Sequence, residues 1–468
     1  MSTVERLSGA DRAWLLMERP TNLMMIVALI VLERRLTRAR LRALIAARFL
    51  AFERFRCFPV ADALGARWVE AERFDIDDHV SSLALPASAA QPELEALVGE
   101  LAGTPFNPGR PLWTFHLVER YQRGSAIIVR IHHCYADGIA LVRVLLSLAD
   151  DPRGSGARRH VPAVPQRATT LAAGLAGLVP APFAAAVRGG MELVESGFDY
   201  MLHPAAASAA ARDALGYAGE LVHIAALGED PLTRLKRPLS GARRVAWAEP
   251  QPLEEVRTIG HVFGCTINDV LVSTLSGALG RYLAAHGDAI TAKTTIRAAV
   301  PVNLRAEGEP LTLGNRFGLV FVELPIGIRH PLERLYAVHA AMQELKGSYQ
   351  AGATLGLMSV VGTLPSPVEE PTTALFTAKA SLVVSNLPGP REPLRLAGAV
   401  IGQVLFWVPE AGSIGTGISV LTYRGEVQFG VISDRQMIER PRELIALIGA
   451  EFERLVCLTL LGAGALLA

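Results

Sequence analysis

Cysteine is scarce in this sequence. Four cysteines occur among 468 residues, at positions 57, 134, 265 and 457. None stands at the paired spacing of a zinc ribbon or a thioredoxin-type motif, and isolated thiols of this kind are typical of reduced cysteines in a cytosolic protein. The first residues lack a basic segment followed by a long apolar run, so we expect no secretory signal. The sequence therefore favours a cytoplasmic protein without a disulfide framework.

The chain also lacks an excess of charge and a long apolar run. Its 46 Lys and Arg residues nearly balance 45 Asp and Glu residues, and a formal net charge of +1 gives no overall field that would attract nucleic acid. A membrane-spanning helix needs about 20 apolar residues, and the stretches at 23–32 and 455–468 are shorter. The stretch at 171–187 is interrupted by Pro180 and Pro182. We therefore expect no spanning helix, whereas peripheral membrane contact, aided by the 455–468 tail, stays open.

Apolar residues are nevertheless abundant. They make up 50% of the chain, and the mean hydropathy is +0.30, which fits a large buried core, a lipid-facing surface, or both. The length suggests two or three domains or one two-lobed body. Changes in amino-acid composition divide the chain into a first lobe at 1–150, a connection rich in Pro, Gly and Ala at 151–215, and a second lobe at 216–468.

Hydrophobic periodicity predicts a mixed α/β protein. Short apolar runs bounded by turn residues predict strands at 24–32, 126–131, 294–300, 317–324 and 381–385, and a hairpin of strands 416–423 and 426–432 turned at Arg424 and Gly425. Apolar residues at helical spacing predict helices at 37–55, 139–148, 267–285 and 441–455.

The strongest local signal for chemistry is the segment His-His-Cys-Tyr-Ala-Asp-Gly at 132–138. A predicted strand leads into it and a predicted helix leaves it, which would hold both imidazoles on rigid backbone. Imidazole suits the removal of a proton from an attacking hydroxyl, because its unperturbed pKa is ~6.5. A pair of hydrogen-bonded structural histidines and a metal site are the alternatives, although no third metal ligand follows at a recognisable spacing. The residues alone are compatible with a catalytic role and with a structural one, because short motifs recur in unrelated settings.

The segment resembles the His-His-x-x-x-Asp-Gly signature of acyl-CoA-dependent acyltransferases such as chloramphenicol acetyltransferase and peptide-synthetase condensation domains. Further segments resemble, in order along almost the whole chain, those of the bacterial wax ester synthase/diacylglycerol O-acyltransferases. They are the opening at 7–11 and 18–22, Pro-Leu-Trp at 111–113, Asn-Asp at 268–269, and the blocks at 300–305, 314–318 and 385–390.

The resemblance assigns roles within the signature. It implies that His133 is the general base and that His132 orients its neighbour or bonds to the backbone. It also implies that Asp137 is an architectural carboxylate, and an aspartate before an apolar helix is in any case a good N-cap. Gly138 would permit a tight turn and leave room for substrate. Cys134 is not expected to be a nucleophile, because the family requires no thiol at this position and buried cysteine is usually a small apolar residue.

Residues outside the signature keep two interpretations each. Asn268 is expected to help to bind or stabilise the reacting carbonyl, and Asp269 is expected beside it as a substrate-binding residue. The alternative is that both serve the start of the 267–285 helix. Pro111, Leu112 and Trp113 are expected to shape part of the wall of a substrate pocket. The alternative is that Trp113 is an ordinary residue of the hydrophobic core. Ser385 is expected to be a residue at a strand end rather than a nucleophile.

The resemblance implies two lobes of the chloramphenicol acetyltransferase type, each with a mixed sheet and flanking helices, and an active-site channel between them. It implies an O-acyltransferase that moves a long-chain acyl group from acyl-CoA to a fatty alcohol, a diacylglycerol, or both, without a metal or other cofactor. The expected partners are acyl-CoA, the lipid alcohol, and the surface of the inner membrane or of lipid inclusions. An acyltransferase for a polyketide or carrier-bound hydroxyl, and a non-catalytic lipid-binding protein, are the alternatives.

Overall fold

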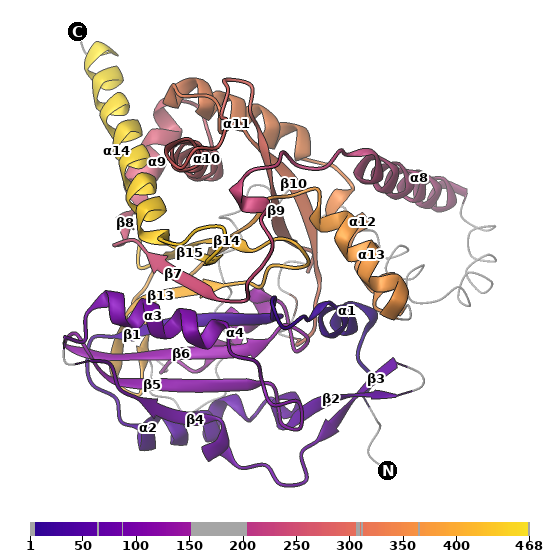
Figure 1. The fold of residues 1–468 in the computed structure, drawn as a ribbon, viewed down its shortest axis with the longest axis vertical. Helices are drawn as coiled ribbons and strands as arrows, with labels where there is room; N and C mark the ends of the chain where they lie inside the picture. Colours follow the sequence, from indigo (N-terminus) through magenta and orange to yellow (C-terminus); the bar gives the residue numbers. More distant parts are fainter. Residues whose placement is uncertain are drawn as a thin grey trace.

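The computed structural model describes residues 5–62, 65–86, 88–150, 204–305, 309, 312–363 and 366–466. Two sheets form the framework of two lobes, which lie one above the other in Figure 1. Both lobes combine strands with helices, so the predicted mixed α/β class is confirmed. Most of the predicted connection, residues 151–203, lies outside the described residues, and helix α8 (Pro204–Ala226) runs across its predicted end at 215.

The first lobe is built on a six-stranded sheet. Its strand order is β12-β13-β1-β6-β5-β4. The strands are β1 (Met25–Leu32), β4 (Val80–Leu83), β5 (Trp113–Tyr121), β6 (Gly124–His132), β12 (Arg395–Leu396) and β13 (Ala399–Trp407). Alternate residues of β1 pack into separate clusters on the two faces of the sheet, Ile26 and Ala28 on one side and Val27 and Leu29 on the other. The continuous apolar sequence of β1 is explained by this burial on both faces.

The predicted lobe boundary is wrong in one respect. Strands β12 and β13 come from the C-terminal part of the chain, yet β13 pairs antiparallel with β1 of the first lobe. Figure 1 shows β13 in orange close to the purple strands of the N-terminal sheet. This exchange could not be predicted, because strand pairing over about 370 residues depends on long-range contacts and not on local periodicity.

The second lobe is built on a seven-stranded sheet. Six of its strands lie side by side in the order β10-β9-β11-β14-β15-β7, and the seventh, β8 (Gln251–Pro252), pairs with β15. The strands that lie side by side are β7 (Arg243–Trp247), β9 (Ile296–Asn303), β10 (Phe317–Leu324), β11 (Leu382–Pro388), β14 (Thr416–Tyr423) and β15 (Glu426–Asp434). The predicted hairpin is confirmed: β14 and β15 turn at Arg424 and Gly425, whose φ angles of 56° and 78° suit a tight hairpin turn.

Helices cover both lobes. The helices of the first lobe are α1 (Gly9–Met17), α2 (Arg38–Leu44), α3 (Gln91–Ala102) and α4 (Gly138–Ser147). Besides α8, the second lobe carries α9 (Leu253–Val262), α10 (Ile267–Ala285), α11 (Pro331–Leu345), α12 (Gln350–Val361), α13 (Ser366–Thr377) and α14 (Pro441–Leu466). Residues of α9, α10, α11 and α14 share one hydrophobic core with β9, β10, β11, β14 and β15.

Two helix predictions need correction. The predicted helix at 37–55 breaks up, because α2 passes into a π-helical turn (Ile45–Phe49) and then a separate 3-10 turn (Glu53–Arg56). The apolar 455–468 tail is no separate segment, since α14 continues through it to residue 466. Among the described helices, no single one combines the length and apolar character needed to cross a bilayer; α9 and α10 pass that test only as a pair bent by 99°.

Candidate active site

An apolar cavity lies between the two lobes. Its empty volume is about 820 Å³, part of which is open to solvent. The first lobe contributes Trp14, His133, Asp137, Gly138 and Ile139 to its wall, and also Phe406 from β13. The second sheet and the neighbouring 376–377 and 408–414 segments supply the rest, mostly aliphatic and aromatic side chains. Of the predicted site residues, the fold thus brings His133, Asp137 and Gly138 together at this cavity.

Backbone hydrogen bonds and ring contacts fix the position of His133. It directly follows β6, and its backbone N–H donates to the carbonyl of Met24 at 2.8 Å. Its own carbonyl accepts a hydrogen bond from Asn315 Nδ2 at 2.9 Å. The imidazole stacks on Trp14, with ring centroids 3.9 Å apart, and lies 5.6 Å from the ring of Phe317. The ring therefore has a fixed orientation at the cavity wall.

Burial sets the protonation state of His133. Burial lowers the pKa of its imidazole to about 4, and the opposing effect of the nearby Asp137 carboxylate is smaller. The ring is therefore neutral at pH 7 and has one nitrogen that can accept a proton. Its Nδ1 atom is buried and finds no hydrogen-bond partner in the part of the chain that the structure describes. A buried neutral imidazole of this kind can act as a base toward a hydroxyl group.

His132 is tied to a carboxylate that the sequence reasoning missed. Its Nδ1 accepts a hydrogen bond from the backbone N–H of Cys134 at 3.1 Å, so its Nε2 carries the proton and donates to Glu18 Oε2 at 2.9 Å. Burial raises the pKa of Glu18, but the hydrogen bond and the electrostatic interaction with His132, together with the hydrogen bond from Met24, outweigh burial, so the pKa is lowered overall. Glu18 also accepts from the N–H of Met24. Glu18 thus helps to fix Met24, which directly precedes β1 and whose carbonyl accepts the hydrogen bond from the backbone N–H of His133.

Asp137 joins the two lobes. As the predicted N-cap of α4, it accepts a hydrogen bond from the N–H of Ala140 at 2.9 Å. Its other oxygen accepts from Arg305 Nη1 at 2.5 Å and from the N–H of Arg316 at 2.9 Å. Arg305 also donates to the carbonyl of Gly314 at 2.7 Å. The carboxylate is fully occupied by these donors, which fits an architectural role; the Arg305 partner was missed, although it stands in the 300–305 block.

Gly138 leaves space at the cavity. A Cβ atom at this position would come within 3.2 Å of the ring of Phe406 and 3.5 Å of the Val408 side chain. Both of those side chains line the cavity as well. A larger residue at 138 would therefore narrow the cavity beside His133.

Asn268 lies away from the cavity, so this geometry does not support its predicted contact with the reacting carbonyl. Its Oδ1 accepts a hydrogen bond from Asn386 Nδ2 at 2.7 Å. Successive side chains of a strand point to opposite faces, and Ser385 and Leu387 face the cavity. Asn386, and Asn268 with it, therefore lie on the other face of β11, where α10 packs.

Asp269 has a structural role. It completes a capping box with Thr266 at the start of α10, as the alternative interpretation proposed. Its Oδ2 is also 2.7 Å from Nδ1 of His339. Together with Cys265, these two residues form a group whose potential metal-ligand atoms lie within 4.8 Å of one another. The group is outside the wall of the His133 cavity, and the hydrogen bonds of Asp269 already account for its position.

The segment at 111–113 belongs to the core and not to the cavity wall, as far as the described residues define that wall. Trp113 is fully buried, donates from Nε1 to the carbonyl of Phe55 at 2.7 Å, and stacks on His79. The N–H of Leu112 donates to the hydroxyl of Tyr135 at 3.0 Å. The pocket-wall prediction for Pro111, Leu112 and Trp113 therefore gains no support, and the alternative of Trp113 as plain core fits.

Cys134 is unsuited to nucleophilic attack. Its side chain is fully buried in the core of the first lobe. Burial raises the pKa of the thiol well above its ordinary value, and nearby carboxylates act in the same direction. A thiol that stays protonated is a poor nucleophile.

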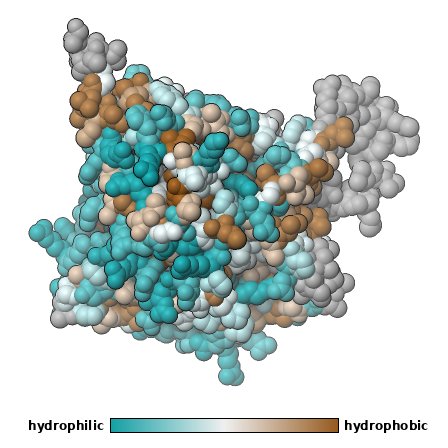
Figure 2. All heavy atoms as spheres, turned by 45° about the horizontal axis from the view of Figure 1, so that its top comes forward, coloured by the Kyte–Doolittle hydropathy of each residue, from teal (hydrophilic) through white to brown (hydrophobic). Residues whose placement is uncertain are grey.

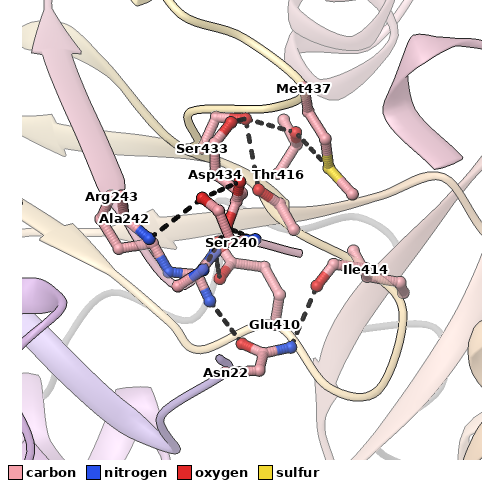
Figure 3. A network of polar contacts seen from close by, with 12 residues as sticks. Asn22, Ser240, Ala242, Arg243, Glu410, Ile414, Thr416, Ser433, Asp434 and Met437 are labelled. Carbon is pink, nitrogen blue, oxygen red and sulfur yellow. Dashed lines mark hydrogen bonds and ion pairs between the residues drawn. The ribbon is translucent and has the colours of Figure 1, made fainter. Parts of the chain in front are cut away.

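A polar network beside the cavity links the lobes a second time (Figure 3). Asn22, from the 18–22 segment, donates to the carbonyls of Gly412 and Ile414 at 3.1 Å each, and accepts from Arg243 Nη2 at 2.5 Å. Arg243 in turn lies 3.6 Å from the buried carboxylate of Glu410. Ile414 lines the cavity, so this network fixes one part of its wall.

Comparison with known proteins gives one consistent result for both halves of the chain. A family model described as the wax ester synthase/diacylglycerol acyltransferase catalytic domain matches residues 7–271, and a model of the C-terminal domain of the same family matches residues 313–456. A Mycobacterium tuberculosis protein named "probable diacylglycerol O-acyltransferase" is 28% identical over 404 residues, which cover 85% of this chain and 82% of the relative.

Two solved structures share the fold. The wax ester synthase/diacylglycerol acyltransferase from Marinobacter aquaeolei superimposes with a TM-score of 0.67 at 19% identity, over 97% of this chain and 99% of that one. The first condensation domain of the calcium-dependent antibiotic synthetase gives a TM-score of 0.61 at 16% identity, over 98% and 96% of the two chains. The predicted two-lobed architecture is thereby confirmed.

Proposed function

Because the chain belongs to the wax ester synthase/diacylglycerol acyltransferase family and is an acyltransferase, we propose that it transfers a long-chain acyl group from acyl-CoA to a fatty alcohol or a diacylglycerol, with His133 as the general base. One observation carries the proposal. A neutral, fixed imidazole lies at the wall of an apolar cavity to which both lobes contribute.

The chemistry follows from this placement. His133 accepts the proton of the alcohol while the alcohol oxygen forms a bond to the thioester carbonyl carbon. The tetrahedral intermediate collapses, the carbon–sulfur bond breaks, and the CoA thiolate takes the proton from the imidazolium. The products are an ester and free CoA, and His133 returns to its neutral form. Burial that lowers its pKa to about 4 keeps it neutral between turnovers.

The walls of the cavity support a lipid substrate. Most of its lining side chains are apolar, among them Phe317, Phe321, Phe376 and Leu387. Each methylene of an acyl or alkyl chain gains ~0.8 kcal/mol when it leaves water for such a surface. A long chain therefore binds this cavity far better than a short or polar one.

The deciding experiment offers the purified enzyme palmitoyl-CoA with hexadecanol or dipalmitoylglycerol. Thiol release is measured, and the products are separated by thin-layer chromatography. We expect a wax ester or a triacylglycerol, and a loss of activity of at least about 10²-fold in His133→Ala. His261→Ala, which changes an exposed histidine, is the matched control. Esterification of polyketide or carrier-bound hydroxyls alone would contradict the proposed acceptors, and full activity of His133→Ala would contradict the proposed base.

We also propose that the end of α14 contacts a membrane or lipid-inclusion surface. The first part of the apolar tail packs on the body, since Leu455 is fully buried and Thr459 nearly so. Farther along the helix, Leu460 and Leu461 are 69% and 72% exposed. Figure 2 shows apolar side chains in brown at the upper left, where α14 ends. Exposed leucines on a protruding helix fit insertion into a lipid surface.

Flotation with phosphatidylglycerol vesicles tests this contact. The double variant Leu460→Ser/Leu461→Ser should shift the protein from the floating to the soluble fraction, whereas Leu232→Ser, at a leucine 89% exposed elsewhere, should not. Equal flotation of the wild type and the double variant would refute the contact.

A further inference from the structure

We propose that the hydroxyl of Ser385 donates a hydrogen bond to the carbonyl oxygen of the acyl thioester as negative charge develops on that oxygen. This inference rests on the proposed acyl transfer at the His133 cavity. It assigns the charge-stabilising group to the second lobe, opposite the base, and to a residue for which the sequence indicated only a place at a strand end.

The first observation is the pattern of the strands beneath the cavity. β10, β9 and β11 are neighbours in the second sheet, and each sends alternate side chains into the cavity. These are Phe317, Leu319 and Phe321 of β10, then Ala299, Pro301 and Asn303 of β9, and finally Val383, Ser385 and Leu387 of β11. Seven of these nine side chains are apolar, so the two polar ones stand out.

The second observation is that the Ser385 hydroxyl is unused. Ser385 is 2% exposed, and its Oγ atom makes no hydrogen bond within the described chain. A buried polar group left unpaired costs about 1–3 kcal/mol. A bound carbonyl oxygen in the cavity would satisfy the hydroxyl, so the cost is recovered when the substrate is present.

The carboxylate and hydroxyl groups that line the cavity besides Ser385 are already engaged, and the unpaired Nε1 of Trp14 belongs to the ring stacked on His133. Asp137 is held by Arg305 and two backbone N–H groups. Thr377 Oγ1 donates to the carbonyl of Thr373 at 2.9 Å, and the side-chain oxygen of Asn303 accepts from the N–H of Arg305 at 3.2 Å. Ser385 thus offers the cavity a hydroxyl that no protein group competes for.

The third observation is the rigid support of Ser385. β11 pairs in parallel with β14 through six residue pairs, and Ser385 lies opposite Ser419 in the middle of that ladder. The donor therefore keeps its place while the reaction proceeds, which is what makes a hydrogen bond to a developing oxyanion effective. His133 comes from the first lobe and Ser385 from the second, and both side chains line the same cavity, so base and donor can reach one bound thioester from different lobes.

Kinetics of Ser385→Ala with palmitoyl-CoA and hexadecanol test the assignment. Loss of one oxyanion donor costs about 10²–10³-fold in kcat. We expect a fall in kcat of at least about 10²-fold, with KM for palmitoyl-CoA changed less than about threefold, and at least about tenfold recovery in Ser385→Thr. Ser419→Ala is the matched control, because Ser419 faces Ser385 across the ladder but bonds to the carbonyl of Gly430.

Two readouts separate this role from a structural one. The urea midpoint of Ser385→Ala should equal or exceed that of the wild type, because the substitution removes an unpaired buried hydroxyl. The pH dependence of kcat should keep its shape, because His133 still titrates the reaction. A fall in urea midpoint that accounts for the lost activity would overturn the assignment, and so would an effect confined to KM.

The outcomes also distinguish this proposal from the proposed function. If His133→Ala is inactive while Ser385→Ala keeps its kcat within about threefold, the oxyanion assignment alone fails. If His133→Ala is fully active, the proposed function itself fails. Detection by mass spectrometry of an acyl group attached to Ser385 during turnover would show a nucleophile and would likewise overturn the donor role.

Discussion

Replacement of Arg305 by methionine should destabilise the protein by about 3–5 kcal/mol, because it leaves a buried charge without its partner. The side chains of Arg305 and Asp137 are 2% and 3% exposed, and their closest atoms lie 2.5 Å apart. Asp137 would keep only the N–H groups of Ala140 and Arg316 as donors. The loss is a large share of a typical unfolding free energy of about 5–15 kcal/mol.

Urea unfolding followed by tryptophan fluorescence measures the effect in Arg305→Met, Asp137→Asn and the double variant. Because the two groups are in contact, the double variant should lose less than the sum of the single variants, by about 0.5–3 kcal/mol. Arg316→Met is the control, since its guanidinium is half exposed and pairs with Glu309, and should cost at most about 1 kcal/mol. A loss below 1 kcal/mol in Arg305→Met, or strict additivity in the cycle, would refute the reasoning.

Three further predictions concern His133 and Glu18. Burial lowers the pKa of His133 to about 4, so kcat/KM of the free enzyme should fall on the acid side near pH 4, and a midpoint near pH 6.5 would contradict a buried base. Because the unfolded chain takes up this proton at its ordinary pKa of ~6.5, the stability of the fold should decline as pH falls from about 6.5 toward 4. Glu18→Gln should lower kcat about tenfold without moving that midpoint, because it weakens the support of His132 and Met24 but leaves the burial of His133 unchanged. Unchanged kcat in steady-state assays would dismiss Glu18 as a positioning residue.

The parts of the site that could be predicted are local in the chain. The signature predicted a strand, a short loop and a helix, and β6 ends at His132 while α4 begins at Gly138. The N-cap prediction for Asp137 is also confirmed, because capping depends on the few residues that follow. Periodicity and capping act over one or two turns, so a single sequence is enough to read them.

The parts that could not be predicted depend on which side of a sheet a residue faces. Ser385 and Asn386 are neighbours in one motif, yet only Ser385 lines the cavity, and Asn268 bonds to Asn386 on the other face. The register of β11 decides this, because a shift by one residue would exchange the faces of Ser385 and Asn386. That register is set by pairing with β14, about 30 residues away, and with β9, more than 80 residues away. No pattern within the motif itself carries this information.

The division of the site between two lobes has a physical consequence. His133 and Ser385 can act on one thioester only while the lobes keep their relative position. Asn315 serves this directly, because its side-chain amide donates both to Asp11 of α1 at 2.8 Å and to the carbonyl of His133 at 2.9 Å. The Asp137–Arg305 pair and the Asn22 network add two further ties beside the same cavity. Polar side chains are costly to bury, and their concentration where the lobes meet, around an otherwise apolar cavity, would hold the proposed base and the proposed donor at a fixed separation.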